Sequence, residues 1–211
     1  MKKGCMIVCD GSNGAGKTTL IRALQEHLKQ KGIEVVLSRE PGGTPIGEKI
    51  RDIILDPTTP EMCDITELML FAAGRAQHVT EKIIPAINAG KVVISDRFAT
   101  ATVSFQHYAR GLSFELITEL NDIALNGFKP DINIILDLDP VIGLERVNSR
   151  GEGLDRLEDE NIEFLNRARN GYLVQAKQDP NHFAIIDASQ PQDKVIAEAI
   201  SIIENLIKDR C

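Results

Sequence analysis

The sequence predicts one α/β domain in which a parallel sheet is covered by helices on both faces. Short apolar runs suited to buried strands alternate with stretches of helical periodicity along all 211 residues. A glycine-rich turn at residues 11–18 joins the first apolar run to the first helical stretch. We find no internal repeat or interdomain linker, so residues 1–211 are expected to fold as a single domain.

Five runs of aliphatic residues predict the strands of this sheet. Each run is short, rich in valine, isoleucine or leucine, and bounded by polar or glycine-containing segments. In parallel sheets such strands are buried on both faces, which explains why the runs do not alternate with polar residues. The strands are expected at residues 6–9, 34–38, 91–95, 131–137 and 183–187.

Helices are expected in the intervals between the strands. Within 19–30, Leu20, Leu24 and Leu28 recur at helical spacing, and Gly32 marks the end of that helix. Proline at a helix start is favourable, since its missing N–H would have no partner there. Further helices are expected at 45–55, at 64–88, on either side of Gly111, at 140–149, at 158–177 and from Pro191 onward.

Composition and charge narrow the class of protein. The formal net charge of −7 argues against a nucleic-acid-binding body, which would show a basic stripe. No apolar run approaches about 18 residues and no signal peptide precedes the first strand, so we expect a cytoplasmic protein with no membrane partner. The four cysteines form no C-x-x-C pair, which predicts free thiols rather than a zinc site or a disulfide framework.

The glycine-rich turn matches the phosphate-binding P-loop, G-x-x-x-x-G-K-[ST]. Its backbone N–H groups and the positive end of the following helix attract phosphate oxygens, Lys17 can reach the outer phosphates, and the Thr18 hydroxyl can ligate Mg²⁺. The alternative is an ordinary glycine turn that opens a helix. The residues that match the motif are Gly11, Ser12, Asn13, Gly14, Ala15, Gly16, Lys17 and Thr18.

Charged residues at the expected carboxyl edge of the sheet indicate phosphoryl transfer between two phosphate-bearing molecules. Guanidinium groups grip phosphate bidentately, and the polar loop at 149–157 is expected to act as a lid. Asp96 ends a buried strand and is a candidate for the magnesium shell; its alternative role is to cap the helix that begins near Ala99. The arginines are Arg39, Arg51, Arg75 and Arg97 near the sheet, and Arg146, Arg150 and Arg156 around the lid. For any one of them the alternative is a solvated surface charge.

Five stretches together resemble the bacterial thymidylate kinase family. They are the P-loop, Arg-Glu-Pro-Gly-Gly-Thr at 39–44, Asp-Arg-Phe at 96–98, Phe-Gln at 105–106 and Leu-Asp-Arg-Leu-Glu at 154–158. The resemblance implies transfer of the γ-phosphoryl group of ATP to dTMP, giving dTDP and ADP in dTTP biosynthesis. It also implies Mg²⁺, a homodimer, and the three-layer P-loop nucleoside monophosphate kinase fold with a five-stranded parallel sheet flanked by helices.

The resemblance also implies roles for individual residues. Lys17, Arg97 and Arg150 are expected to be catalytic, and Thr18 and Asp96 to hold the metal. ATP binding is assigned to residues 11–18 with Thr19 and Arg146. For dTMP, the stacking aromatic is Phe71 and the base-reading arginine is Arg75, one helical turn later. The other expected dTMP-binding residues are Glu40, Pro41, Arg51, Arg97, Thr102, Phe105 and Gln106.

The chain departs from the family pattern at a few of these places. Asn13 stands where a carboxylate is usual and keeps only the hydrogen-bond acceptor. Phe98 and Phe105 stand where a hydroxyl-bearing or imidazole ring is common, and Ala101 replaces a serine. Two other functions stay open at this point: a kinase for another nucleotide or small phosphorylated metabolite, and a non-catalytic nucleotide-binding switch. The Asn-Lys-x-Asp motif that GTPases need is absent from the sequence.

Overall fold

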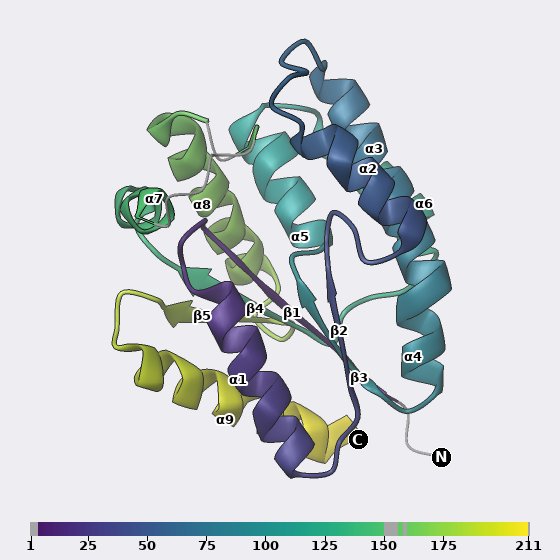
Figure 1. Cartoon of the computed structure of the whole chain (residues 1–211), viewed down its shortest axis with the longest axis vertical. Helices are drawn as coiled ribbons and strands as arrows, with labels where there is room; N and C mark the ends of the chain where they lie inside the picture. Colours follow the sequence, from purple (N-terminus) through teal and green to yellow (C-terminus); the bar gives the residue numbers. More distant parts are fainter. Residues whose placement is uncertain (1–3, 150–155, 158–159, 211) are drawn as a thin grey trace.

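The centre of the molecule is a five-stranded sheet in which every pair of neighbouring strands is parallel (Figure 1). The computed structural model describes residues 4–149, 156–157 and 160–210. The strand order is β2-β3-β1-β4-β5. The strands are β1 Met6–Gly11, β2 Val35–Arg39, β3 Val92–Asp96, β4 Ile132–Asp137 and β5 Phe183–Asp187. Each falls on a predicted run, and the predicted fold class is confirmed.

Helices α1 (Lys17–Gln30) and α9 (Gln192–Arg210) cover one face of the sheet (Figure 1). Their apolar side chains pack against Ile7 and Cys9 of β1 and the matching residues of the neighbouring strands. Met6 and Val8, the alternate residues of β1, pack into a second cluster with the helices of the other face. The alternation of side chains along a strand therefore produces the three layers.

The other face carries the remaining helices. The helix predicted at 64–88 is continuous: α3 (Asp64–His78) passes through a π-helical stretch (Val79–Ile83) into α4 (Ile84–Asn88). Pro85, the second residue of α4, does not end the helix. The other helices are α2 Pro45–Leu55, α5 Ala99–Thr102 with a π-helical continuation Val103–Ala109, α6 Phe114–Leu125, α7 Pro140–Asn148 and α8 Ile162–Gln178.

Helix α8 starts later than expected, whereas helix α5 starts at Ala99 as expected. Helix α8 begins at Ile162 and not at 158, because the Asn161 side chain caps it by accepting a hydrogen bond from the Phe164 N–H at 2.9 Å. Phe98 occupies the N-cap position of helix α5, and among the described residues no side chain accepts a hydrogen bond from the first turn of that helix. Asp96 lies earlier, at the end of β3. The alternative role of Asp96 as a helix cap is therefore wrong.

The loops that follow β1, β2 and β3 meet at one edge of the sheet. Strand β3 lies between β1 and β2, so Asp96 and Arg97 are flanked by the P-loop on one side and by residues 40–44 on the other. Within the described residues no helix is both long and apolar enough to cross a bilayer. Cys5, directly before β1, and Cys9, within it, are buried, and Cys63 is exposed.

Candidate active site

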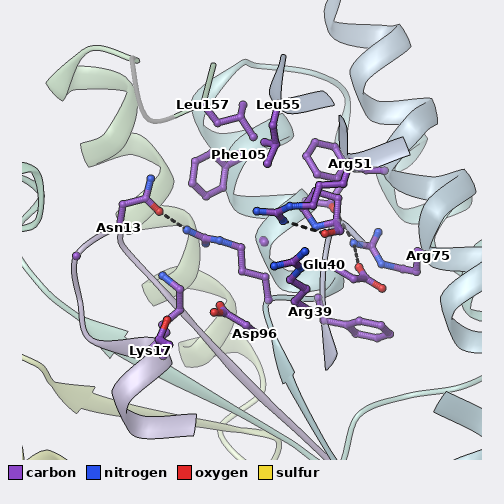
Figure 2. Close-up of a pocket in the computed structure, with 18 of the residues that line it drawn as sticks. Asn13, Lys17, Arg39, Glu40, Arg51, Leu55, Arg75, Asp96, Phe105 and Leu157 are labelled. Carbon is purple, nitrogen blue, oxygen red and sulfur yellow. Dashed lines mark hydrogen bonds and ion pairs between the residues drawn. The ribbon is translucent and has the colours of Figure 1, made fainter. Parts of the chain in front are cut away.

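A cavity of about 370 Å³ opens at this edge of the sheet. Figure 2 shows Asn13 and Lys17 of the P-loop on one side of it and Arg51, Glu40 and Arg75 on the other. The predicted residues that line the cavity are Asn13, Gly14, Gly16, Lys17, Thr18, Thr19, Glu40, Pro41, Arg51, Phe71, Arg75, Asp96, Arg97, Thr102 and Phe105. Arg39, Leu55, Phe98, Ala101 and Leu157 complete the lining.

Several predicted residues do not line the cavity. Gly11 and Ala15 are buried in the P-loop, and Ser12 is half-buried on it. The exposed side chain of Arg146 donates a hydrogen bond to the Gly14 carbonyl at 3.3 Å. Gln106 is fully buried and donates to Glu67 Oε1 at 2.5 Å, outside the lining. Arg150 and most of the proposed lid at 149–157 lie outside the described residues.

The P-loop has its expected shape for anion binding. Gly14 and Gly16 have φ angles of 73° and 93°, in the left-handed region that glycine adopts without strain. Lys17 Nζ donates to the Gly11 and Ser12 carbonyl oxygens at 3.2 and 3.0 Å, so its charge is held over the loop.

Helix α7 packs unusually close to the P-loop. A Cβ atom on Gly14 would lie 2.3 Å from the Gly143 carbonyl oxygen, and a Cβ atom on Gly143 would lie 2.3 Å from the Asn13 carbonyl oxygen. Both contacts are with backbone atoms, which cannot rotate away. Gly143 is therefore a functional position that the sequence analysis missed, because nothing in the local pattern of α7 distinguishes it from an ordinary helix glycine.

Replacing Gly143 with alanine is expected to displace the P-loop. For the substrates that the family resemblance implies, we expect the KM for ATP to rise about 10- to 100-fold, since small misplacements of a binding element are costly, while the KM for dTMP changes much less. Steady-state kinetics with each substrate varied in turn checks this. Gly74→Ala is the control, since the nearest atom to its new Cβ would be 3.6 Å away. Equal increases in both KM values would contradict a local effect on the P-loop.

Arg97 is held by four acceptors. Its Nη1 donates to Asp10 Oδ1 at 3.0 Å, to the Gly11 carbonyl at 3.1 Å and to the Tyr172 hydroxyl at 2.8 Å, and its Nη2 donates to Asn13 Oδ1 at 2.5 Å. The backbone of Arg97 has a φ of 67°, a left-handed conformation uncommon outside glycine. Asn13 thus supplies, through its amide oxygen, an acceptor for Arg97.

Asp10 and Tyr172 form the buried base of this arrangement. The Tyr172 hydroxyl donates to Asp10 Oδ1 at 2.7 Å, and the Gly11 N–H donates to the same oxygen at 2.9 Å. Burial raises the pKa of the Asp10 carboxyl, while attraction by Arg97 and the hydrogen bond from Tyr172 limit that rise. The sequence offered one signal for Asp10, an acidic residue at the end of an otherwise apolar run; Tyr172 lies too far along the chain to be paired with it by spacing.

At the other end of the cavity, Phe71 and Arg75 share one face of α3. The side chain of Arg75 is only 1% exposed. Its Nη1 donates to Asn121 Oδ1 at 2.7 Å, and its Nη2 donates to Thr102 Oγ1 at 2.9 Å. Glu40, expected beside the sugar, turns its carboxylate toward Arg75, with Oε2 2.7 Å from Nη2.

Arg156, grouped with the proposed lid, attaches to helices α2 and α3. Its Nε donates to the Ile54 carbonyl at 2.9 Å, and its guanidinium pairs with the Glu67 carboxylate. Arg110 Nε donates to the same carboxylate at 2.8 Å. Burial acts to raise the pKa of Glu67, but the hydrogen bonds from Arg110, Gln106 and Arg156 outweigh it and the pKa is lowered.

This lowered pKa predicts a pH-dependent contribution to stability. A carboxylate with a depressed pKa in the folded state stabilises fully above its ordinary pKa of about 4.5 and loses that contribution as the pH falls through the folded value. Glu67→Gln is therefore expected to lower the free energy of unfolding at pH 7 by about 2 kcal/mol. Urea denaturation at pH 7 and in acid checks this: the difference from the original chain should shrink in acid. Glu119→Gln, on the exposed side of α6, is the control. A difference that stays constant with pH would contradict an ionic role for Glu67.

Comparison with known proteins identifies the family. A sequence model described as thymidylate kinase matches residues 9–199. The chain belongs to the thymidylate kinase family. A thymidylate kinase of Geobacillus sp. is 44% identical over 209 residues, covering 99% of this chain and 100% of the relative. A thymidylate kinase of Desulfovibrio desulfuricans is 42% identical, covering 97% of each. The crystal structure of thymidylate kinase from Ehrlichia chaffeensis superimposes with a TM-score of 0.78 at 31% identity, covering 96% of this chain and 99% of that one.

Membership of the thymidylate kinase family confirms the resemblance seen in the five sequence stretches. Thymidylate kinases are ATP-dependent phosphotransferases that convert dTMP to dTDP in dTTP synthesis. The sheet order, the P-loop and the loop after β2 are therefore those of a nucleoside monophosphate kinase.

Proposed function

We propose that the cavity holds ATP and dTMP together and transfers the γ-phosphoryl group between them. The observation that carries the proposal is the two-sided cavity: the P-loop lies at one side and Arg75 at the other (Figure 2). Phe71, on the same helix as Arg75, also lines the cavity. Arg97 stands between them, since β3 lies between β1 and β2. Phosphoryl transfer needs mainly positioning and stabilisation of charge, which such an arrangement supplies.

For the donor, the P-loop backbone and Lys17 hold the β- and γ-phosphates, with Thr19 and Arg146 beside them. Arg97 binds the acceptor phosphate, and Arg51 assists it from α2. The Arg51 side chain donates to the Pro41 carbonyl at 2.9 Å, which holds it across the loop after β2. Arg150 is proposed to stabilise the charge of the transferring group.

For the acceptor, Phe71 stacks on thymine and Arg75 donates hydrogen bonds to the base. Thr102 supports Arg75, and Phe105 flanks the sugar with Pro41. The half-buried position of Phe71 in the lining favours stacking on a ligand over a role in the core.

The donor set at the P-loop fits Mg²⁺. Thr18 and Asp96 both line the cavity, and a hydroxyl with one carboxylate leaves the other positions for phosphate oxygens and water, as Mg²⁺ prefers. The bound ion would neutralise charge on the β- and γ-phosphates.

We also propose a homodimer located in the cytoplasm. Large apolar side chains are exposed on three adjacent helices: Ile53 of α2 is 50% exposed, Met69 of α3 55% and Ile123 of α6 75%. Such neighbouring exposure is typical of a protein interface. The molar mass in solution, measured by light scattering, tests this, and a mass of 23.2 kDa at micromolar concentration would contradict it.

A panel of nucleoside monophosphates tests the reaction. With ATP and Mg²⁺, we expect dTMP to be phosphorylated with a higher kcat/KM than dCMP, UMP or AMP, and removal of Mg²⁺ to abolish turnover. Preference for another monophosphate would overturn the assignment to dTMP. Binding of ATP with no product from any acceptor would support the alternative of a non-catalytic switch.

A further inference from the structure

A chain of polar side chains leads from Arg75 away from the cavity. Glu40 Oε2 lies 2.7 Å from Arg75 Nη2, and Glu40 Oε1 lies 2.9 Å from His78 Nδ1. On the far side of the imidazole, His78 Nε2 lies 2.5 Å from Ser38 Oγ. Neither His78 nor Ser38 lines the cavity.

The burial of this chain fixes the direction of its hydrogen bonds. The side chains of His78 and Glu40 are 0% and 5% exposed, so water does not compete for these contacts. A carboxylate only accepts, so His78 Nδ1 donates to Glu40. In the neutral ring Nε2 is then the acceptor, and the Ser38 hydroxyl donates to it. Glu40 thereby selects the tautomer, and the Ser38 hydroxyl satisfies the Nε2 atom of that tautomer.

The surroundings leave little room for another arrangement. A Cβ atom on Gly43 would lie 2.7 Å from both His78 Nε2 and Ser38 Oγ, so the loop passes directly over this hydrogen bond. Phe98 packs against the other end: its ring centre is 5.4 Å from the Arg75 guanidinium carbon and 6.5 Å from the centre of the His78 ring. The arginine and the imidazole are thus held on one shared apolar surface.

Arg75 keeps donor capacity that these contacts do not use. Asn121 takes a proton of Nη1, while Thr102 and Glu40 take those of Nη2. The Nε atom is buried and has no hydrogen-bond partner among the described residues. Because Arg75 also lines the cavity, its remaining N–H groups are donors of fixed direction, suited to a carbonyl oxygen of a ligand.

We propose that Ser38, His78 and Glu40 are positioning residues that fix the side chain of Arg75. Through Arg75 they set the preference for a pyrimidine that carries a carbonyl group where cytosine carries an amino group. The inference rests on the proposed contact between Arg75 and the base. A guanidinium group donates hydrogen bonds and never accepts them. It can therefore pair with a carbonyl oxygen, but it cannot form a hydrogen bond with the N–H of an amino group, which is also a donor. A buried polar site of this kind rejects the wrong partner only while its geometry is held.

The test compares dTMP, dUMP and dCMP as acceptors in Ser38→Ala, His78→Leu and His78→Asn. Asparagine keeps an N–H that can donate to Glu40, whereas leucine removes it. In Ser38→Ala and His78→Leu we expect the ratio of kcat/KM for dTMP over dCMP to fall about tenfold, the factor expected for one lost hydrogen bond. The KM for dTMP should rise, and the KM for ATP and the ratio of dTMP over dUMP should stay within about twofold. His78→Asn should retain most of the discrimination.

A second histidine–glutamate pair provides the control. His27 Nε2 lies 3.0 Å from Glu204 Oε1 on the opposite face of the sheet, so His27→Asn and His27→Leu should leave both ratios unchanged. A dTMP-to-dCMP ratio that is unchanged in Ser38→Ala would overturn the proposal even if His78→Leu fails to fold. An equal rise in both KM values would also overturn it, since it indicates general loosening. If the original chain does not phosphorylate dTMP, the proposed function itself is wrong. If it does and the variants keep the dTMP-to-dCMP ratio, only the role proposed for Ser38, His78 and Glu40 is wrong.

Discussion

Replacing Arg97 with lysine is expected to lower kcat about 100-fold, the loss typical of removing one group that stabilises a transition state. Lysine keeps the charge but presents a single ammonium in place of a planar fork, so it cannot serve Asp10, Asn13 and the acceptor phosphate together. Both residues carry a Cβ atom, so the strain of the left-handed backbone at φ 67° is the same in the two proteins.

Single-turnover kinetics with saturating ATP and dTMP measures this effect on the chemical step. Arg167→Lys is a matched control: Arg167 Nε donates to the Ala109 carbonyl at 3.0 Å and its guanidinium lies over Phe164, outside the cavity lining. The control should keep kcat within about twofold, as surface substitutions usually do. An Arg97→Lys enzyme with full kcat and a raised KM for dTMP would show that Arg97 binds the acceptor without assisting the reaction.

Lys17→Met is expected to lower kcat/KM for ATP about 1,000-fold, because it removes the only charged side chain of the P-loop. Methionine has nearly the length of lysine without its charge. The hydrogen bonds of Lys17 to the Gly11 and Ser12 carbonyls lie beside solvent, so we expect a small change in the melting temperature.

The measurement is steady-state kinetics with ATP varied, together with thermal unfolding in the presence and absence of ADP. The stabilisation by ADP, which depends on its affinity, should be largely lost in Lys17→Met. Lys29→Met, in the last turn of the same helix, is the control and should behave as the original chain does. Undiminished protection by ADP would place the effect of Lys17 in the reaction step and not in nucleotide binding.

The local sequence was sufficient for the fold and for the position of the P-loop between β1 and α1. The five strands were predicted because each is a short apolar run bounded by turns, and the P-loop because its eight residues are contiguous. Both signals depend on residues that are near one another in the chain, where spacing and conformational preference act directly. The predicted start of α8 at residue 158 was wrong, because Asn161 is a strong N-cap residue and outweighs the weaker helical pattern that precedes it.

Some of the residues predicted to bind dTMP line the cavity, and others lie away from it. The family resemblance assigned Phe71 and Arg75 to the base, and both line the cavity. It also assigned Gln106 there, and the structure turns that side chain to Glu67 instead. A long polar side chain can reach several partners, and its sequence position does not say which one burial will favour.

The sequence by itself determined that this protein is a parallel α/β phosphotransferase with a P-loop, since the strand pattern and the motifs are contiguous along the chain. Only the tertiary structure decided which side chains hold Arg75 and Arg97 at the cavity. Tyr172 meets Asp10 across 162 positions, Arg97 meets Asp10 across 87, and His78 meets Glu40 across 38. These contacts depend on how helices pack over the sheet, and burial makes each of them obligatory because an unpaired polar group there would be costly.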